Sequence, residues 1–195
     1  MSRQPQTHEL DATKEPPGID RFTSRVLWIA AIGLVIRVLY VAIVARRHPL
    51  IGDSETYPLL AQTIADGRGY VRPRDLTEGL IIPTAEFPPV YPLMLAALTA
   101  LGFDEITWHR MLGVMFGTAT IVVVAHLARK VASERAGIVA GIIAAIYPLF
   151  IISDGTVGPE SLASLCVATL VWWSFRLQRI THFFAVGLVA GMSIL

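Results

Sequence analysis

The strongest constraint on this chain is the segment 26–45, VLWIAAIGLVIRVLYVAIVA, in which Arg37 is the single charged residue. About 20 consecutive apolar residues make a helix long enough to cross the ~30 Å hydrocarbon core of a bilayer. Further apolar segments follow at 88–101, 110–128, 136–153, 160–175 and 183–195. The whole chain is 54% hydrophobic and 16% charged, whereas soluble domains carry about 25% charged residues. We therefore expect an integral membrane protein.

Composition also excludes several functional classes. A net charge of +1 excludes a nucleic-acid-binding protein that relies on bulk electrostatic attraction. The single cysteine, Cys166, excludes an intrachain disulfide framework. The sequence contains neither a Gly-rich phosphate loop nor a His-x-x-x-His metal pair. Function must therefore be sought in the polar residues that interrupt the apolar pattern.

Segment lengths and loop charges predict the topology. Residues 1–24 are polar and rich in proline, which is typical of a disordered tail, and their basic residues place this tail in the cytoplasm. Residues 88–101 form a helix of only ~21 Å, too short to cross. We therefore expect an all-α, polytopic membrane helix bundle, multi-pass in the plasma membrane, with one external segment at 46–109 that carries juxtamembrane helices. The expected spans are five, at about 26–45, 110–128, 136–153, 160–175 and 183–195.

Acidic residues gather on the predicted outer face. Asp53 and Glu55 follow the first span within ten residues, and Asp154 and Glu160 lie in the next external loop. A carboxylate near the lipid headgroups is suited to act as a general base, although acids in such places also merely solvate a loop. Glu160 has a structural explanation as well, because an acid after a proline suits the first turn of a helix.

Two further features concern the spans themselves. A charge in mid-span costs ~2.5–3.5 kcal/mol on insertion scales and normally faces the bundle interior or a polar cavity, so we expect Arg37 to point inward. Glycines at small-xxx-small spacing are typical of helix packing in membranes, and we expect this role for Gly33, Gly113, Gly117, Gly137 and Gly141.

Short motifs recur in a distinctive order through the external segment. They are Gly52-Asp53-Ser54-Glu55-Thr56-Tyr57, then Ala61-Gln62-Thr63-Ile64-Ala65-Asp66-Gly67-Arg68-Gly69-Tyr70, then Phe87-Pro88-Pro89-Val90-Tyr91-Pro92. Arg110, Tyr147-Pro148, Asp154-Gly155 and Glu160-Ser161 continue the order. From Arg25 onward the chain thus resembles GT-C glycosyltransferases of the family 39-like group, which includes protein O-mannosyltransferases and lipid A aminoarabinose transferases.

The resemblance implies a polyprenyl-phosphate-linked sugar donor, a hydroxyl acceptor and inverting transfer. It assigns the catalytic base to Asp53 and a metal contact to Glu86, which makes a divalent metal ion a candidate cofactor. Where a lysine would contact the lipid phosphate in the aminoarabinose branch, this chain has Phe87, so that contact must come from elsewhere. The residues expected to support the base or bind substrate are Arg37, Glu55, Tyr57, Tyr91, Arg110, Asp154 and Glu160.

Other functions stay open at this stage. Complete members of the group have more spans, and this sequence stops within an apolar segment at Leu195. We therefore expect a fragment, a truncated product, or one part of an assembly in which a second chain completes the bundle. The main alternative is a non-catalytic membrane partner that binds polyprenyl lipid or another membrane protein. A small transporter is less favoured, because Arg37 is the sole ionisable residue expected well inside a span.

Overall fold

The computed structural model describes residues 20–76, 78–175, 187 and 191. These residues confirm the all-α prediction, with one isolated β-bridge between Val71 and Pro83. The elements are α1 (Arg21–Ile43), the 3-10 turn η1 (Ala45–Arg47), α2 (Asp53–Ala65), α3 (Pro73–Leu76), α4 (Val90–Ala100), α5 (Ile106–Val131), α6 (Glu134–Ile146), α7 (Pro148–Asp154) and α8 (Glu160–Ser174).

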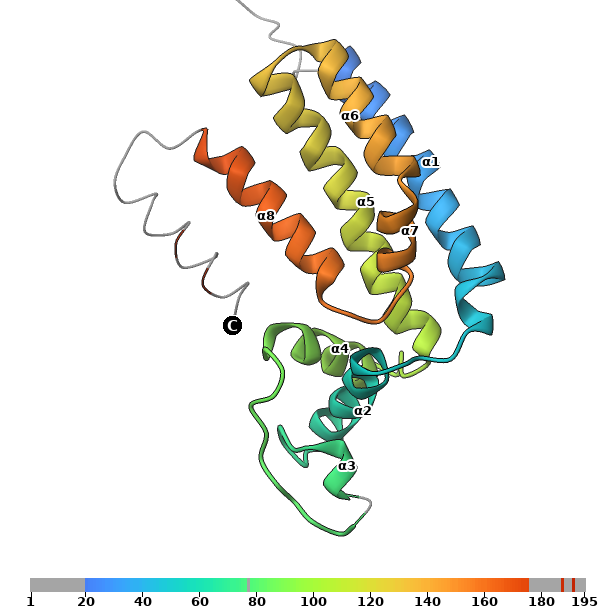
Figure 1. Cartoon of the computed structure of the whole chain (residues 1–195), viewed down its shortest axis with the longest axis vertical. Coiled ribbons are helices and arrows are strands. Elements are labelled where there is room, and N and C mark those ends of the chain that lie inside the picture. The colour runs from blue at the N-terminus through green and yellow to red at the C-terminus, as the bar shows by residue number, and fades with distance from the viewer. Residues whose placement is uncertain (1–19, 77, 176–186, 188–190, 192–195) are drawn as a thin grey trace, which may run out of the picture.

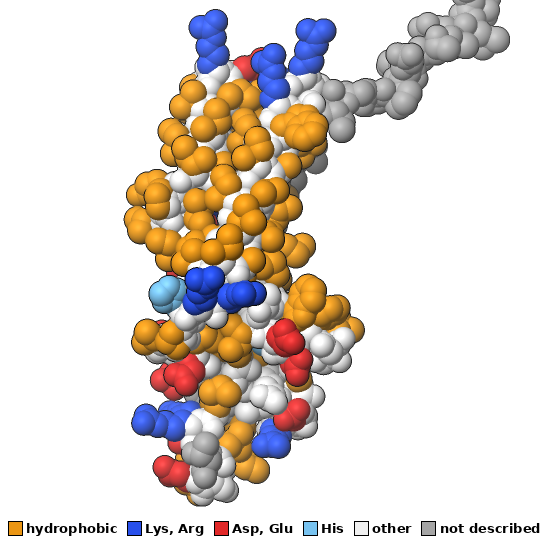
Figure 2. Space-filling model, turned by 90° about the vertical axis from the view of Figure 1, so that its right-hand side faces the viewer, with side chains coloured by type: hydrophobic (Ala, Val, Ile, Leu, Met, Phe, Trp, Pro, Cys, Tyr) orange, Lys and Arg blue, Asp and Glu red, His pale blue; other side chains and the backbone are white. Residues whose placement is uncertain are grey.

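The helices form two parts (Figure 1). Helices α1, α5, α6, α7 and α8 make an elongated bundle, and α2, α3 and α4 gather at the end of the bundle where α1 finishes and α5 begins. Figure 2 shows hydrophobic side chains around the bundle, bounded by Lys and Arg at its far end, and charged side chains over the other part. We call α2–α4 and their connections the external part, because they belong to the segment 46–109 that the sequence analysis expects outside the membrane. Its two ends meet the bundle on the same side, as expected of a segment that does not cross.

Two of the expected spans are single helices. The α1–η1 segment and α5 are each long and apolar enough to cross a membrane. Helix α4 is shorter than a span, as its sequence predicts, and α8 has 15 residues, which make ~22 Å of helix. The fifth expected span, 183–195, lies outside the described residues except for Gly187 and Gly191.

The expected span at 136–153 is not one straight helix. It is a broken pair, α6 and α7, bent by 56°. Pro148 lacks the N–H that an α-helix requires and disfavours the helical conformation at the residue before it. Tyr147 accordingly has an extended backbone, with φ −67° and ψ 118°.

The first helix begins earlier than predicted, at Arg21 instead of residue 26. Asp20 caps it, since its Oδ1 accepts a hydrogen bond from the Thr23 N–H at 2.7 Å. Its Oδ2 accepts another from Arg129 of α5 at 2.6 Å. The predicted tail boundary at residue 24 is therefore too late, and the rest of that tail, residues 1–19, lies outside the described residues.

The glycines pack the helices together, which confirms their predicted role. A Cβ added at Gly33 would lie 2.5 Å from the Ile121 side chain, and one at Gly137 would lie 2.7 Å from the Ala125 carbonyl oxygen. At Gly113 it would lie 2.5 Å from the backbone oxygen of Asp154. Side chains at these positions would push the helices apart.

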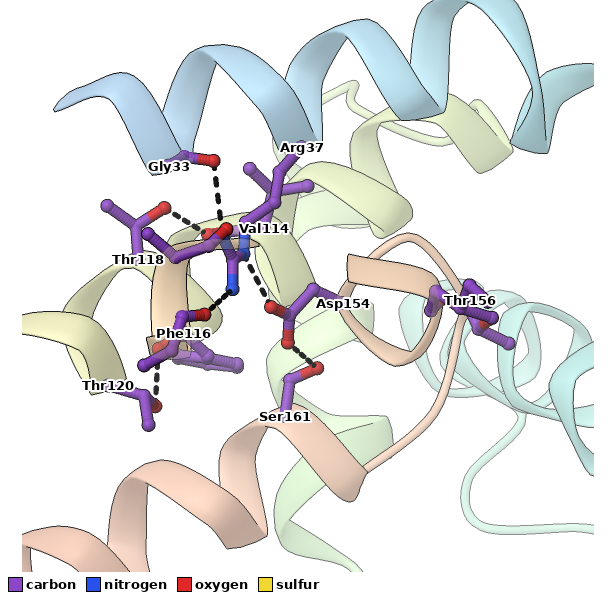
Figure 3. Close-up of polar contacts among 12 residues, drawn as sticks. Gly33, Arg37, Val114, Phe116, Thr118, Thr120, Asp154, Thr156 and Ser161 are labelled. Carbon is purple, nitrogen blue, oxygen red and sulfur yellow. Dashed lines mark hydrogen bonds and ion pairs between the residues drawn. The ribbon is translucent and has the colours of Figure 1, made fainter. Parts of the chain in front are cut away.

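A buried ion pair ties the bundle together (Figure 3). Arg37 is 1% exposed and points inward as expected, and its Nε donates to Asp154 Oδ2 at 2.6 Å. The other guanidinium nitrogens donate to the carbonyls of Ala144 and Ala145 at 3.0 Å each. These two carbonyls end α6, and the break at Pro148 leaves them without helical donors. Asp154, which the sequence analysis placed in an external loop, is therefore buried: the residue is 4% exposed and neutralises Arg37.

Gly117 allows the closest of these approaches. A Cβ added there would overlap the Asp154 carboxylate. We predict that Gly117→Ala lowers the free energy of unfolding by ~1–3 kcal/mol, because an added methyl group in a packed core forces its neighbours to shift. Thermal unfolding in detergent measures the change. Met115→Leu, at a 65% exposed position of the same helix, is the control, and equal transition temperatures for both variants would contradict the packing.

Removing one member of the ion pair should lower the free energy of unfolding more than removing both charges does. We predict that Arg37→Met lowers the free energy of unfolding by ~3–5 kcal/mol, because it leaves Asp154 buried and unpaired. Adding Asp154→Asn should restore part of the loss. The same unfolding measurement compares the single and double variants, and a double variant less stable than Arg37→Met would show that the unpaired charge is not the cause.

Candidate functional site

An aromatic cluster joins the external part to the bundle. The ring of Tyr57 in α2 meets the rings of Phe87 and Tyr91 edge-on, with centroids 5.0 and 5.2 Å apart. Val157, in the loop between α7 and α8, belongs to the same buried cluster. Tyr70 fixes the segment before α4 by donating from its hydroxyl to the Phe87 carbonyl at 2.8 Å. We call this buried cluster of Tyr57, Phe87, Tyr91 and Val157 the junction. It holds α2 and α4 against the bundle.

The carboxylates of Asp53 and Glu160 act on the tyrosines of this junction. Burial, followed by the negative charges of Asp53 and Glu160, raises the pKa of Tyr57 to about 12. Burial also raises the pKa of Tyr91 above its ordinary value; the Gly158 backbone N–H opposes that shift and the charge of Glu160 adds to it. Both phenols therefore stay protonated near neutral pH and can donate hydrogen bonds. Two of the predicted site residues, Tyr57 and Tyr91, are thus in contact, and the charges of two others, Asp53 and Glu160, act on the Tyr57 phenol.

The two carboxylates occupy equivalent places in their helices. Asp53 is the first residue of α2 and Glu160 the first residue of α8, where the positive end of the helix dipole favours an acid. Gly52 has φ 64°, a conformation that glycine adopts without strain, and the chain turns there into α2. Both acids are exposed, so a substrate can reach them.

A second group of predicted residues lies around a separate cavity of about 900 Å³ in the external part. Glu86 approaches Arg72, with Oε2 and Nε 3.5 Å apart, and Arg72 also approaches Asp75 at 3.6 Å. The residues that line this cavity are Glu55, Thr56, Leu59, Arg72, Pro73, Arg74, Asp75 and Glu86. Asp53 is not among them, although it lies only two residues from Glu55.

The expected metal contact does not fit the residues around Glu86. Hard divalent cations take six or more oxygen ligands. Among the described residues, no three His, Cys, Asp or Glu side chains gather to share a metal ion. The partner of Glu86 is instead the guanidinium of Arg72, which repels a cation.

Arg110 lies at the other side of the junction, near the start of α5. It is 5% exposed, and its Nη2 donates to the carbonyl of His48, just after η1, at 3.2 Å. Its Nε has no hydrogen-bond partner among the described residues. The guanidinium therefore contacts the chain just before α2 and keeps one buried donor unpaired.

Arg37 and Asp154 lie inside the bundle, but they reach the site through a residue that the sequence analysis missed. Ser161 donates from its Oγ to Asp154 Oδ1 at 2.7 Å (Figure 3), and it directly follows Glu160. A serine in the first turn of an apolar helix carries no signal of such a role. Its motif position, next to Glu160, is the sole hint in the sequence.

The family of this chain follows from comparison with known proteins. No curated protein and no solved structure matches the chain. A family model described as dolichyl-phosphate-mannose-protein mannosyltransferase matches residues 86–195, which is more than half of the chain. The match includes Glu86, Tyr91, Arg110, Asp154 and Glu160, whereas Asp53 precedes it. Together with the apolar spans, it identifies a membrane protein of the GT-C glycosyltransferase type. The chain belongs to the dolichyl-phosphate-mannose-protein mannosyltransferase family.

Proposed function

We propose that this chain carries the outer-face site of a multi-pass plasma-membrane glycosyltransferase. The enzyme would transfer a sugar from a polyprenyl-phosphate-linked donor to a hydroxyl acceptor, with inversion at the anomeric carbon. The observation that carries the proposal is the packing of Tyr57 of α2 with Val157 and Leu162, the latter in the first turn of α8, because α2 begins at Asp53 and α8 begins at Glu160. Family membership supports glycosyl transfer as the reaction.

Asp53 is the proposed general base. The acceptor oxygen attacks the anomeric carbon while the Asp53 carboxylate takes the hydroxyl proton. The bond between that carbon and the phosphate oxygen breaks, and the polyprenyl phosphate leaves with the electron pair. A single displacement of this kind inverts the configuration and needs no second nucleophile. Asp53 suits the role because it is exposed, at the end of the chain segment that leaves the membrane.

A cation must balance the charge of the leaving phosphate. Arg72 is poorly placed for this, because Asp75 and Glu86 already offset its charge. Arg110 contacts a neutral carbonyl, and no acid among the described residues offsets its charge. Its Nε is buried and has no partner in that part of the chain, and the residue lies near the start of the spanning helix α5. We therefore assign the donor phosphate to Arg110, in keeping with a donor whose lipid tail stays in the bilayer.

The remaining residues of the junction would orient the sugar. Tyr57 is a neutral donor at working pH, and the exposed Glu160 carboxylate can accept hydrogen bonds from sugar hydroxyls. Tyr91 supports both from beneath, as part of the buried cluster. Glu55 faces the cavity of about 900 Å³, and we assign that cavity to the incoming acceptor.

Replacing Asp53 tests the proposal. Asp53→Asn keeps the shape of the side chain and removes the base, so transfer should fall by ~10²–10⁴-fold. The assay follows a labelled sugar from a synthetic polyprenyl-phosphate donor in membranes that contain the full-length protein. Asp66→Asn, the same change at the other end of α2, is the control and should keep normal activity. Full activity of Asp53→Asn would sink the proposal and favour a non-catalytic membrane partner.

A further inference from the structure

Three buried side chains run from the middle of α1 to the start of α8 (Figure 3). Arg37 Nε donates to Asp154 Oδ2 at 2.6 Å, and Ser161 Oγ donates to Asp154 Oδ1 at 2.7 Å. All three residues are at most 5% exposed. Asp154 thus uses one carboxylate oxygen on each neighbour, and both hydrogen bonds are charge-assisted.

The Arg37 end of this series of three side chains is fixed. Besides Asp154, the Arg37 guanidinium donates to the backbone carbonyls of Gly33, Ala144 and Ala145. Gly117 presses against the Asp154 carboxylate from α5, where no larger residue would fit. The cavity beside the pair holds about 10 Å³, at the lower limit for one water molecule. Asp154 therefore has no room for an alternative position.

The outer end determines where α8 begins. Helix α8 has Pro159 as its N-cap and no side-chain capping hydrogen bond. The Ser161–Asp154 bond is thus a tether from the rigid bundle to the first turn of this helix. Glu160 is the neighbouring residue in that turn. Val157 and Leu162, which lie before and after it in the sequence, pack in the buried cluster with Tyr57 and Tyr91, and the negative charge of Glu160 acts on both phenols. Any shift of Ser161 moves Glu160 as well.

We infer that Arg37, Asp154 and Ser161 form a positioning relay that sets the place of Glu160 beside Tyr57. Ser161 is a positioning residue, because it lies beneath the junction and acts through its neighbour. The inference rests on the proposed function of the junction. It goes further by linking that outer site to the buried ion pair, so that the bundle core controls the geometry of the transfer.

Ser161→Ala tests the relay by removing one hydroxyl. We expect kcat for transfer to fall about tenfold, well within the ~100-fold loss that a 1 Å misplacement can cause, with donor KM within about twofold of normal. Ser161→Thr keeps the hydroxyl and should restore at least half of kcat. Ser174→Ala is the matched control on the same helix, since the Ser174 hydroxyl bonds only to the Val171 carbonyl one turn back. All variants are measured in the full-length protein, at equal amounts in membranes.

A double-mutant cycle separates positioning from general stability. If Ser161 acts through Glu160, adding Ser161→Ala to Glu160→Gln should cause less than about a twofold further loss, because the group being positioned is already gone. A further tenfold loss in the double variant would overturn the inference, as would a normal kcat for Ser161→Ala. Should Ser161→Ala fail to accumulate, Ser161→Cys, close to serine in size and a weak donor, takes its place in the same cycle.

The result for Asp53→Asn distinguishes failure of the relay from failure of the proposed function. If Asp53→Asn abolishes transfer while Ser161→Ala has a normal kcat, the proposed function stands and the relay is wrong. If Asp53→Asn keeps full transfer, the proposed function itself fails, and the relay to a catalytic junction fails with it.

Discussion

The bundle depends on the burial of one arginine. An unpaired guanidinium in mid-span is costly, and Arg37 is satisfied by the charge of Asp154 and by carbonyl oxygens. Those carbonyls are available because Pro148 breaks the span and leaves the end of α6 without donors. The unpaired carbonyls at the end of α6 accept the hydrogen bonds that the buried guanidinium must donate. Burial of either group without the other would be unfavourable, and together they hold α1, α6 and α7 at one point. Gly117 completes the arrangement by leaving space for the carboxylate.

The junction with the external part builds on this rigid point. Tyr57 and Tyr91 pack against Val157 in the loop that follows α7, so α2 and α4 rest on a segment that the ion pair has already fixed. Asp53 and Glu160 enter the junction from opposite parts of the molecule, one from the external helices and one from the bundle. The distance between the two carboxylates therefore depends on how the external part packs against the bundle. Packing at the aromatic cluster thereby becomes a determinant of the chemistry proposed for the two acids.

Much of this arrangement is visible in the sequence, for reasons that can be stated residue by residue. The apolar length of 26–45 and 110–128 predicts two spans, and the motif order of the external segment assigns Asp53 and Tyr57 to one site. The break at Pro148 escapes a reading based on apolar length alone, because the segment on both sides is uniformly apolar. Asp154 is misplaced for a related reason: an aspartate followed by glycine at the end of an apolar run is typical of an exposed turn. Its burial depends on a partner, Arg37, that is distant in sequence, and on a glycine that makes room in a third helix.

The distribution of charge also bears on the choice between transport and transfer. A transporter needs ionisable groups in the membrane that can exchange partners. Arg37 and Asp154 are ionisable and buried, but every acceptor around Arg37 holds it in one place and the space beside the pair is about 10 Å³. Asp53 and Glu160 are instead exposed, at the end of the bundle where a lipid-anchored phosphate would meet an acceptor arriving from water. The Arg37–Asp154 pair is fixed within the bundle, whereas Asp53 and Glu160 are accessible at its end. This distribution of charge favours glycosyl transfer at the membrane surface over transport.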